Sequence, residues 1–534
     1  MDQVTGWTGE TACVLQAALR LSNEAFAEHL GIGVRTVAAW HQKPTLRPRP
    51  EMQQLLDTAL EQAPAPARTR FLVLTGDYAH AGIPPQPDVR LPDDRVVADA
   101  ELRLSTDPAI RIALDRLDEH TGWEPGTARQ NVASRLARLD AHHLHDRASL
   151  RGRVGQRHFA EALGGYYRER GSGHGRYRAR YGQDNEIITS VLTHPGWLDL
   201  GCPLTAACDR LTLTNLTADR DMWLDEEAAG TAAQRLAEIL ATGTRLIDMP
   251  LYRLLDINVR KGEIAGALGV THFVRYALTM DLLEGELADA LTADLFPRPG
   301  SLPLRDLYLP DLSSVLGVND RLCAGGAQAL CAFARPANPY RGPADYVLLI
   351  QERSGSVVNA AHRLAVIPKG FHQPMTDFRA DARIGATLRR EMEEELFGRE
   401  DIDNTVAEPY AADPMHPSRL SEPMRWLMEN PDFLTIECTG FGLNLVSGNF
   451  EFACLIIVDS EDFWLRYGGQ IEANWESMTL RQYSSLDSES INELAHDPAW
   501  SNEGLFALLQ GLRRLKQVGG NRVDVPAIEW GVQE

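Results

Sequence analysis

The stretch LRREMEEELFG at 388–398 concentrates glutamates whose spacing could gather carboxylates around a metal ion. Wound as a helix at about 100° per residue, 384–397 places one apolar stripe along positions 384, 388, 392 and 396. Glu391 and Glu395 then lie within about 20° of Ile384, and Glu394 neighbours Glu391 at a spacing of three. Because a hard divalent cation makes clustered carboxylates tolerable, the pattern predicts a metal site at these three glutamates.

An ordinary solvated helix is the alternative interpretation of the same stretch. Arg389 and Glu393 stand four residues apart, as do Arg390 and Glu394, and such pairs suit an exposed face. Arginine before glutamate is the weaker orientation of such a pair. The spacing by itself leaves both interpretations open.

The elements expected around these glutamates are two strands, 344–354 and 362–371, followed by the helix and by a third strand at 450–459. In this setting the stretch REMEEE resembles the second half of the Nudix box, which runs Arg-Glu-apolar-x-Glu-Glu. The matching residues are Arg390, Glu391, Met392, Glu394 and Glu395.

The resemblance implies a Nudix-like α/β domain in which Glu391, Glu394 and Glu395 hold Mg²⁺ beside a diphosphate. Such a metal assists the attack of water on phosphorus. The chain departs from the box at Thr376 and Ala382, where the box has Gly and Glu, and at Phe397, where it has Gly. These departures favour a domain that senses a nucleotide-like ligand, and metal-dependent hydrolysis of nucleoside diphosphate derivatives stays open as the alternative.

A second stretch, FAEHLGIGVRTVAAWHQ at 26–42, predicts two short helices joined by a glycine turn. Ser22 is a candidate cap for the first helix, and Gly31 can end it in a left-handed conformation. Val37 and Trp40, three residues apart, are expected to face inward from a helix at 34–41. The outward residues of that helix are then Arg35, Thr36, Ala38 and Ala39.

This stretch resembles the helix-turn-helix of XRE/Cro-type bacterial regulators, and RPRPEMQQLLDTAL would be a later helix of the same module. The resemblance implies binding of double-stranded DNA by a homodimer on paired half-sites. Arginine and threonine can bond to phosphate or to base edges, and small residues allow close approach to the groove. The candidate DNA-binding residues are Asn23, Arg35, Thr36, Ala39 and Lys43.

Composition restricts the class of protein. The 534 residues carry 44% hydrophobic and 24% charged residues, as is usual for globular domains. The chain has no apolar run of about 18 residues and no secretory signal, so we expect no membrane span and a cytoplasmic location. A net charge of −21 argues against non-specific binding of nucleic acid by the whole surface. Seven cysteines without a C-x-x-C pair indicate reduced, mostly buried thiols.

Changes in residue composition and in the expected secondary structure along the sequence predict a multidomain chain. An all-α helix-turn-helix domain at 1–75 is followed by a Pro-rich linker at 76–100. A mixed α/β middle region without an assigned role spans 101–340, and the α/β Nudix-like domain spans 341–534. Arginines exceed acids between 129 and 180, which could extend a DNA footprint; a solvated surface or a wrapper around the acidic C-terminal domain is the favoured alternative.

These features predict a sequence-specific transcriptional regulator whose C-terminal domain senses a small nucleotide-like effector. No catalytic residue is assigned, and Mg²⁺ is the only cofactor that the pattern indicates. A Nudix-type hydrolase with an accessory DNA-binding module is the alternative function. A protein–protein adaptor whose helices never touch DNA is the third.

Overall fold

The computed structural model describes residues 7–19, 21, 23–43, 46–62, 71, 102–168, 173–181, 185–215, 224–244, 246–354, 362–398, 415–471 and 477–533. Contacts within the chain divide it into two units, Met1–Arg90 and Leu91–Glu534. The predicted Pro-rich linker at 76–100 lies outside the described residues, as does Ser22.

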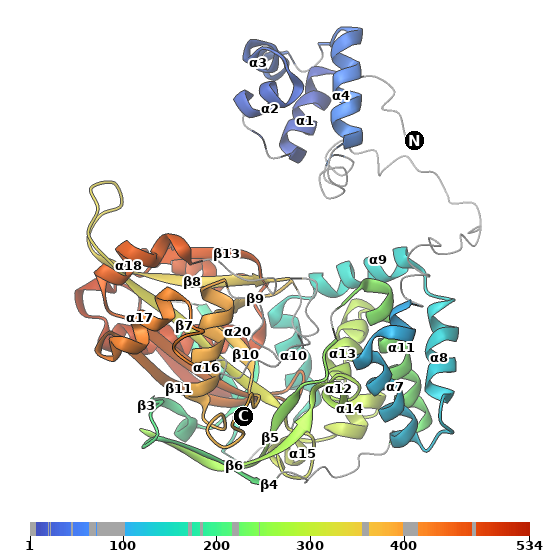
Figure 1. Ribbon diagram of the computed structural model, residues 1–534, viewed down its shortest axis with the longest axis vertical. Helices are drawn as coiled ribbons and strands as arrows, with labels where there is room; N and C mark the ends of the chain where they lie inside the picture. Colours follow the sequence, from blue (N-terminus) through green and yellow to red (C-terminus); the bar gives the residue numbers. More distant parts are fainter. Residues whose placement is uncertain are drawn as a thin grey trace. The chain divides into compact units, whose positions relative to one another are not determined.

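The N-terminal unit contains short helices around one small core (Figure 1). Its helices with described bounds are α1 (Gly9–Leu19), α2 (Asn23–Leu30), α3 (Val34–Gln42) and α4 (Pro50–Gln62). The buried residues of this core are Trp7, Ala12, Leu15, Ala18, Phe26, Ala27, Leu30, Val37, Trp40, Leu56, Ala59 and Phe71. The Trp7 indole donates a hydrogen bond to Asp57 Oδ1 at 2.7 Å and so attaches the start of the described chain to α4.

The turn between α2 and α3 has the predicted geometry. Gly31 adopts a φ of +66°, a left-handed conformation in which a glycine lacks the penalty of a Cβ. The N–H of Ile32 donates to the Ala27 carbonyl at 2.9 Å, which closes the end of α2. Val37 and Trp40 are 0% and 2% exposed, so the inward face predicted for the second helix is confirmed.

The C-terminal unit is built on an eleven-stranded mixed sheet. Its strands are β1 (Gly175–Tyr181), β2 (Asn185–Thr193), β3 (Leu198–Pro203), β7 (Gly325–Arg335), β8 (Asp345–Arg353), β9 (Leu364–Val366), β10 (Lys369–Phe371), β11 (Leu434–Asn444), β12 (Phe450–Val458), β13 (Ser477–Ser484) and β14 (Ile528–Gln533). The main path runs β13-β8-β7-β12-β11-β2-β1-β14, with β10 paired to β7, β3 to β11 and β9 to β8. The β7–β12 pair is parallel over nine register positions, from Phe450 opposite Gly325 to Val458 opposite Phe333.

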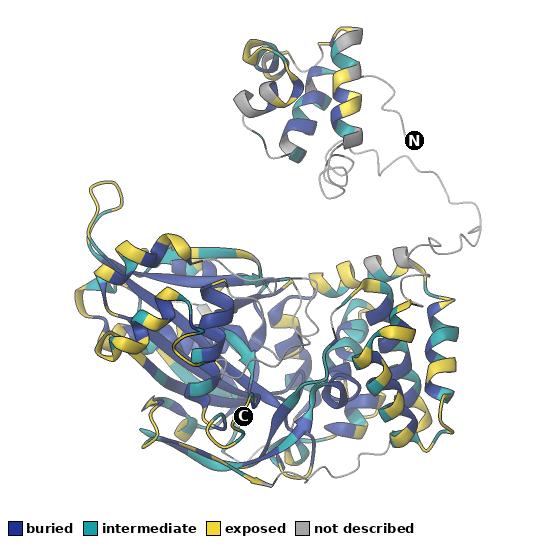
Figure 2. Ribbon diagram, viewed as in Figure 1, coloured by how far each residue is buried: buried dark blue, intermediate teal, exposed yellow. Residues whose placement is uncertain are grey.

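Helices cover both faces of the centre of this sheet. Every residue of β7 and β12 is buried, as expected for strands covered on two sides. Leu330 of β7 belongs to one core cluster with Phe506 of α20 (Asn502–Val518). Cys331, the next residue, belongs to the other core cluster, with Leu388 of α16 (Ile384–Glu391). Figure 2 shows the resulting buried centre and the exposed outer faces of the helices.

A layer of helices and a small second sheet also contribute to the core cluster that contains Cys331 and Leu388. The sheet has the order β4-β6-β5, with β4 (Asp209–Asn215), β5 (Pro250–Arg260) and β6 (Glu263–His272). The helices between 108 and 316 are α7 (Pro108–Thr121), α8 (Thr127–Leu136), α9 (Ala141–Arg153), α10 (Gln156–Tyr166), α11 (Glu226–Thr242), α12 (Phe273–Ala277), α13 (Leu282–Thr292), α14 (Pro303–Tyr308) and α15 (Leu312–Leu316). The remaining helices are α17 (Glu422–Glu429), α18 (Glu461–Tyr467) and α19 (Ser488–Ala495).

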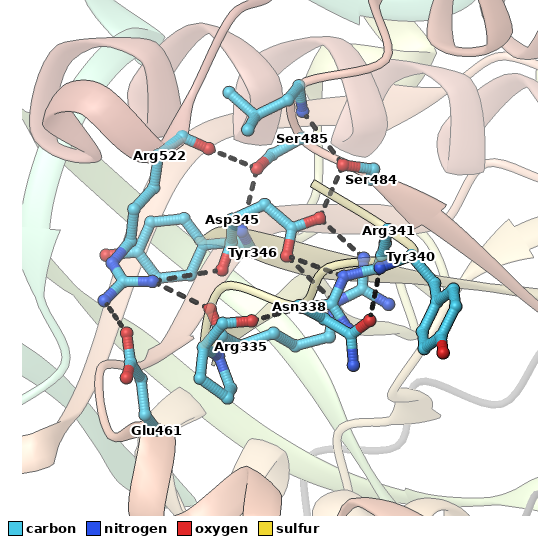
Figure 3. A network of polar contacts seen from close by, with 12 residues as sticks. Arg335, Asn338, Tyr340, Arg341, Asp345, Tyr346, Glu461, Ser484, Ser485 and Arg522 are labelled. Atoms are coloured by element: carbon cyan, nitrogen blue, oxygen red, sulfur yellow. Dashed lines mark hydrogen bonds and ion pairs between the residues drawn. The ribbon is translucent and has the colours of Figure 1, made fainter. Parts of the chain in front are cut away.

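A polar network fastens one end of the β7–β8 hairpin to the rest of the sheet (Figure 3). The Arg335 guanidinium bonds both carboxylate oxygens of Asp345, at 3.0 and 2.6 Å. Ser484 of β13 donates to the same carboxylate at 2.5 Å, and Arg522 donates to the Arg335 carbonyl at 3.0 Å. Burial opposes ionisation of Asp345, but Arg335 and Ser484 hold its pKa below the usual value.

The fold is mixed α/β, as expected, but the predicted boundary at residue 340 does not separate two folding units. Strands β7 and β8 lie on opposite sides of that position and pair with each other. Strands β1 and β2, from the predicted middle region, extend the same sheet beyond β11. The hydrogen bonds between strands join segments that are far apart in the chain, which a change of local pattern cannot reveal.

All seven cysteines are free; Cys13 and Cys208 are partly exposed and the other five are buried. Within the described ranges, no helix has the length and apolar character needed to span a bilayer.

Candidate functional site

The outer face of α3 is open to solvent. Val34 is 41% exposed, and Arg35, His41 and Lys43 are exposed as well. Thr36 and Ala39 are partly exposed, and the N–H of Thr36 donates to the Gly33 carbonyl at 2.8 Å. Four of the five predicted DNA-binding residues therefore lie at or beside one accessible helical surface. The fifth, Asn23, begins α2, and its side chain lies outside the described residues.

Two cations near this surface were not among the predicted contacts. Arg47 and Arg49 are exposed and lie between α3 and α4. The arginines of the stretch KPTLRPRP were the available signal for them in the sequence. With Arg35 and Lys43 they give the unit four exposed positive charges.

The arginine-rich segment is used partly inside the C-terminal unit. Arg147 of α9 pairs with Glu238 of α11 at 2.7 Å and also with Asp289 of α13. Arg151 bonds both Asp289 carboxylate oxygens, at 2.5 and 2.6 Å. These two arginines attach α9 to α11 and α13, which belong to the predicted middle region and not to the acidic C-terminal domain of the alternative interpretation.

The Glu-rich stretch differs from a plain α-helix. The α-helix α16 ends at Glu391, and Met392–Leu396 form a π-helical turn, which locally changes the angle between successive side chains. Glu391, Glu393, Glu394 and Glu395 are all buried, with exposures between 0% and 7%. An exposed, solvated helix is therefore the wrong interpretation of this stretch.

Each of these glutamates has a defined partner. Arg390, itself 4% exposed, pairs with Glu391 at 2.5 Å and with Glu394 at 3.7 Å. Glu395 accepts the backbone N–H of Lys369 at 2.6 Å. Glu393 accepts hydrogen bonds from the N–H and the hydroxyl of Ser421, both at 2.6 Å, and so holds the start of α17 rather than pairing with Arg389.

A second group of charged residues adjoins the glutamates through Lys369. The Lys369 ammonium lies 2.7 Å from Glu503 Oε1, and Asn444 donates to Glu503 Oε2 at 3.1 Å. Gln328 donates to Glu451 Oε2 at 3.4 Å. Lys369, Glu451 and Glu503 were not among the predicted site residues, since nothing local distinguishes them from other charged residues of strands and helices.

The buried carboxylates of this group titrate differently. Burial raises the pKa of Glu451 to about 8, with a further contribution from the charge of Glu503. Burial also acts on Glu503, but the charge and the hydrogen bond of Lys369 hold its pKa below the usual value. At neutral pH the arrangement therefore keeps Glu503 ionised and favours a proton on Glu451.

The predicted magnesium ligands lie beside a buried cation. Glu391 and Glu394 face Arg390, a cation that already occupies their side of the helix. In the portions of the chain with described side chains, no three His, Cys, Asp or Glu residues are grouped so as to hold a metal ion. Arg390 contacts one oxygen of Glu391 and one of Glu394, and Mg²⁺ binding at these glutamates stays a prediction.

The glycine-rich stretch at 437–452 forms the β11–β12 hairpin, with Gly448 at a φ of +75°. It also supplies polar contacts: Asn444 bonds Glu503, and Asn449 donates to the Tyr276 hydroxyl at 3.1 Å. The stretch thus forms a hairpin and also supplies polar side chains that contact Glu503 of α20 and Tyr276.

Comparison with known proteins gave no match: no family model fits the chain, and no curated protein is similar to it.

Proposed function

We propose that this chain is a sequence-specific DNA-binding transcriptional regulator in which α2 and α3 form a helix-turn-helix. The observation that carries the proposal is the exposed face of α3, where Arg35 lies among small or short side chains. Val37 and Trp40 anchor the opposite face of the helix in the core, so its orientation is fixed. A helix of this kind can enter the major groove and present its first turns to base edges.

The charges of the N-terminal unit support the same proposal. Arg35, Lys43, Arg47 and Arg49 are all exposed, and neutralising phosphates is the main source of affinity for duplex DNA. A homodimer would place two such helices roughly 34 Å apart on paired half-sites. A cytoplasmic location is part of this proposal.

A mobility-shift experiment tests DNA binding. DNA fragments that co-purify with the full chain are sequenced and used as probes. We expect a sequence-specific shift that the Arg35→Ala, Thr36→Ala double variant abolishes. The control is Arg466→Ala on an exposed residue of α18 in the C-terminal unit, outside the arginine-rich segment, which should not affect the shift. A wild-type chain that shifts none of these fragments would favour the protein–protein adaptor instead.

We further propose that the C-terminal unit is Nudix-like and senses a small nucleotide-like effector. Support comes from the buried glutamates that follow strands β8 to β10 and from the polar group formed by Lys369, Glu451 and Glu503. An effector can alter DNA binding only if it binds the two conformational states unequally. A panel of nucleotides should include one that raises the melting temperature of the chain and changes the amount of shifted DNA.

Metal-dependent hydrolysis of nucleoside diphosphate derivatives is the second candidate function. It is favoured by the burial of Glu391, Glu394 and Glu395 close to one another on a single helical segment. The test measures release of phosphate or nucleoside monophosphate from dinucleotides in the presence of Mg²⁺. Glu394→Gln should abolish the release, whereas Glu489→Gln, on an exposed residue of α19, should not. Release no greater than background from the wild type would exclude this candidate.

A further inference from the structure

A pocket lies where the end of α10 meets the segment before α14 and the start of α15. Its volume is about 540 Å³, within the usual range for small-molecule sites. The apolar part of its lining consists of Tyr166, Tyr167, Pro299, Pro310 and Leu312. The charged part consists of Arg168, Arg298 and Asp311. Neither the DNA-binding helix α3 nor the group formed by Lys369, Glu451 and Glu503 contributes to this lining.

Arg168 and Arg298 are exposed cations that line this pocket without a carboxylate partner. In the part of the chain that the structure describes, no carboxylate oxygen lies within 4.0 Å of either guanidinium group. A guanidinium has five N–H donors, and the Arg168 side chain uses its Nε to donate to the Gly165 carbonyl at 2.8 Å. Its two Nη groups are therefore available to a ligand in the pocket.

The backbone that carries Arg298 forms a hydrogen-bonded turn. The N–H of Ser301 donates to the Arg298 carbonyl at 3.0 Å, and the Arg298 N–H donates to the Ser301 hydroxyl at 2.9 Å. The Asp306 carboxylate accepts the N–H of Gly300 at 2.8 Å and so attaches the turn to α14. A side chain on a fixed backbone loses less entropy when a ligand binds than one on a mobile segment.

The two tyrosines of the lining present their rings to the pocket rather than free hydroxyls. The Tyr166 hydroxyl donates to Asp306 Oδ1 at 2.5 Å, which connects α10 to the same turn. The Tyr167 hydroxyl donates to the Leu309 carbonyl at 2.8 Å. Because both hydroxyls already donate within the protein, the tyrosines contribute mainly apolar surface, beside the prolines and Leu312.

Asp311 is the carboxylate of the lining. It caps the N-terminus of α15, where its Oδ1 accepts the Ser313 hydroxyl and the Ser314 N–H, both at 2.7 Å. These hydrogen bonds hold the pKa of Asp311 below its usual value, so the group is ionised at neutral pH. A carboxylate has room for about four donors, so Asp311 can also accept a hydroxyl from a ligand.

We propose that this pocket binds a small organic phosphate that carries hydroxyl groups, of the sugar-phosphate type. The phosphate group lies between Arg168 and Arg298, and a hydroxyl of the ligand donates to Asp311. A phosphate monoester has three terminal oxygens and a charge of about −1.5 to −2 at pH 7, so it can accept from two guanidinium groups at once. The carbon skeleton of the ligand then packs on the apolar lining.

The charges of the lining favour this class over other anions. A monocarboxylate has two oxygens and one charge, which a single guanidinium satisfies. A dicarboxylate would bring its second charge toward Asp311, which is ionised and repels it. Inorganic phosphate can bind both arginines, but it leaves Asp311 and most of the 540 Å³ without contacts.

The proposal is independent of the proposed function, so its test uses the full chain without DNA or nucleotides. Glycerol 3-phosphate, ribose 5-phosphate and glucose 6-phosphate are titrated by calorimetry, and the melting temperature is recorded with each. Ribose, inorganic phosphate and succinate are the comparison ligands. We expect at least one organic phosphate to bind with one site per chain, about 10-fold or more tightly than every comparison ligand, and to raise the melting temperature.

Variants then locate the binding site. Arg168→Gln and Arg298→Gln should each weaken binding of the organic phosphate by about 10-fold or more, the usual effect of losing a charged hydrogen bond. Arg111→Gln, on an exposed arginine of α7, is the matched control and should leave binding unchanged. Asp311→Asn keeps an oxygen for the cap of α15 but removes the charge. It should reduce the preference for the organic phosphate over inorganic phosphate.

The arginine variants should fold normally because both side chains are exposed, and the melting temperature of each unliganded variant checks this. Three results would each overturn the proposal. The first is that none of the organic phosphates binds. The second is that inorganic phosphate binds as tightly as they do. The third is that Arg168→Gln and Arg298→Gln both bind the organic phosphate as tightly as the wild type, which would place its site elsewhere in the chain.

Discussion

The ammonium group of Lys369 lies 2.7 Å from a carboxylate oxygen of Glu503, although 134 residues separate them in the chain. The backbone N–H of the same lysine donates to Glu395 at 2.6 Å. Lys369 thus connects the Glu-rich segment after α16 to the N-terminus of α20, on the other side of the sheet's central strands. This connection places the candidate metal ligands, Lys369 and Glu503 in one continuous polar region.

Replacing Lys369 by methionine should strongly destabilise the C-terminal unit. The substitution leaves Glu503, which is 5% exposed, without its cation, and breaking a buried pair from one side costs about 3–5 kcal/mol. Urea unfolding measures the loss, and Lys261→Met, on an exposed lysine, is the control. Adding Glu503→Gln to Lys369→Met should restore part of the stability. A loss below about 1 kcal/mol would contradict the buried pair.

Gly370 should not tolerate even a methyl group. A Cβ at this position would overlap the carboxylate of Glu391, so β10 and α16 would have to move apart. Overpacking of this kind usually costs about 1–3 kcal/mol, and we expect Gly370→Ala to lower the melting temperature accordingly. Gly469→Ala is the matched control, because nothing lies within 4 Å of a Cβ there. Equal melting temperatures for the two variants would show that Glu391 moves away freely.

The buried carboxyl of Glu451 should make stability fall as pH rises. Below pH 4.5 the group is protonated in both the folded and the unfolded chain; between pH 4.5 and about 8 only the folded chain keeps the proton. The stability that this group contributes therefore declines across that range, by at most ~1.4 kcal/mol per pH unit, and levels off above it.

Glu451→Gln isolates this effect, because glutamine keeps the shape and does not titrate. We expect the variant to gain stability relative to the wild type as pH is raised from 5 to 8, measured by urea unfolding at each pH. Glu503 titrates in the opposite sense, since its pKa is lowered, and is present in both chains. Parallel pH profiles for the two chains would rule out a raised pKa at Glu451.

Arg147 and Arg151 should contribute to stability and not to DNA affinity. Both pair with Asp289, and Arg147 also pairs with Glu238, so they hold α9 against α11 and α13. Because these side chains are partly exposed, replacing both with alanine should cost about 1–2 kcal/mol of unfolding free energy. The mobility shift of the proposed operator should be unchanged at moderate salt. A reduced salt dependence of DNA binding would instead place these arginines on phosphates.

The local spacing of residues in the sequence was sufficient to predict several helices and strands. The apolar spacing of 26–42, the glycine at position 31 and the inward Val37 and Trp40 all depend on residues within a few turns of helix, and the structure confirms them. The strands expected at 344–354 and 450–459 appear as β8 and β12 for the same reason.

Only the tertiary structure decided which charges meet. The Glu-rich stretch was found from spacing, but its π-helical turn, its burial and the position of Arg390 depend on packing against β7 and β10. Lys369, Glu451 and Glu503 come from segments tens to hundreds of residues apart, and each looks like an ordinary surface residue in isolation. The chain's amino-acid order specifies local helices and strands through short-range periodicity, whereas these charges meet because long-range packing of helices and strands brings together segments that are far apart in the sequence.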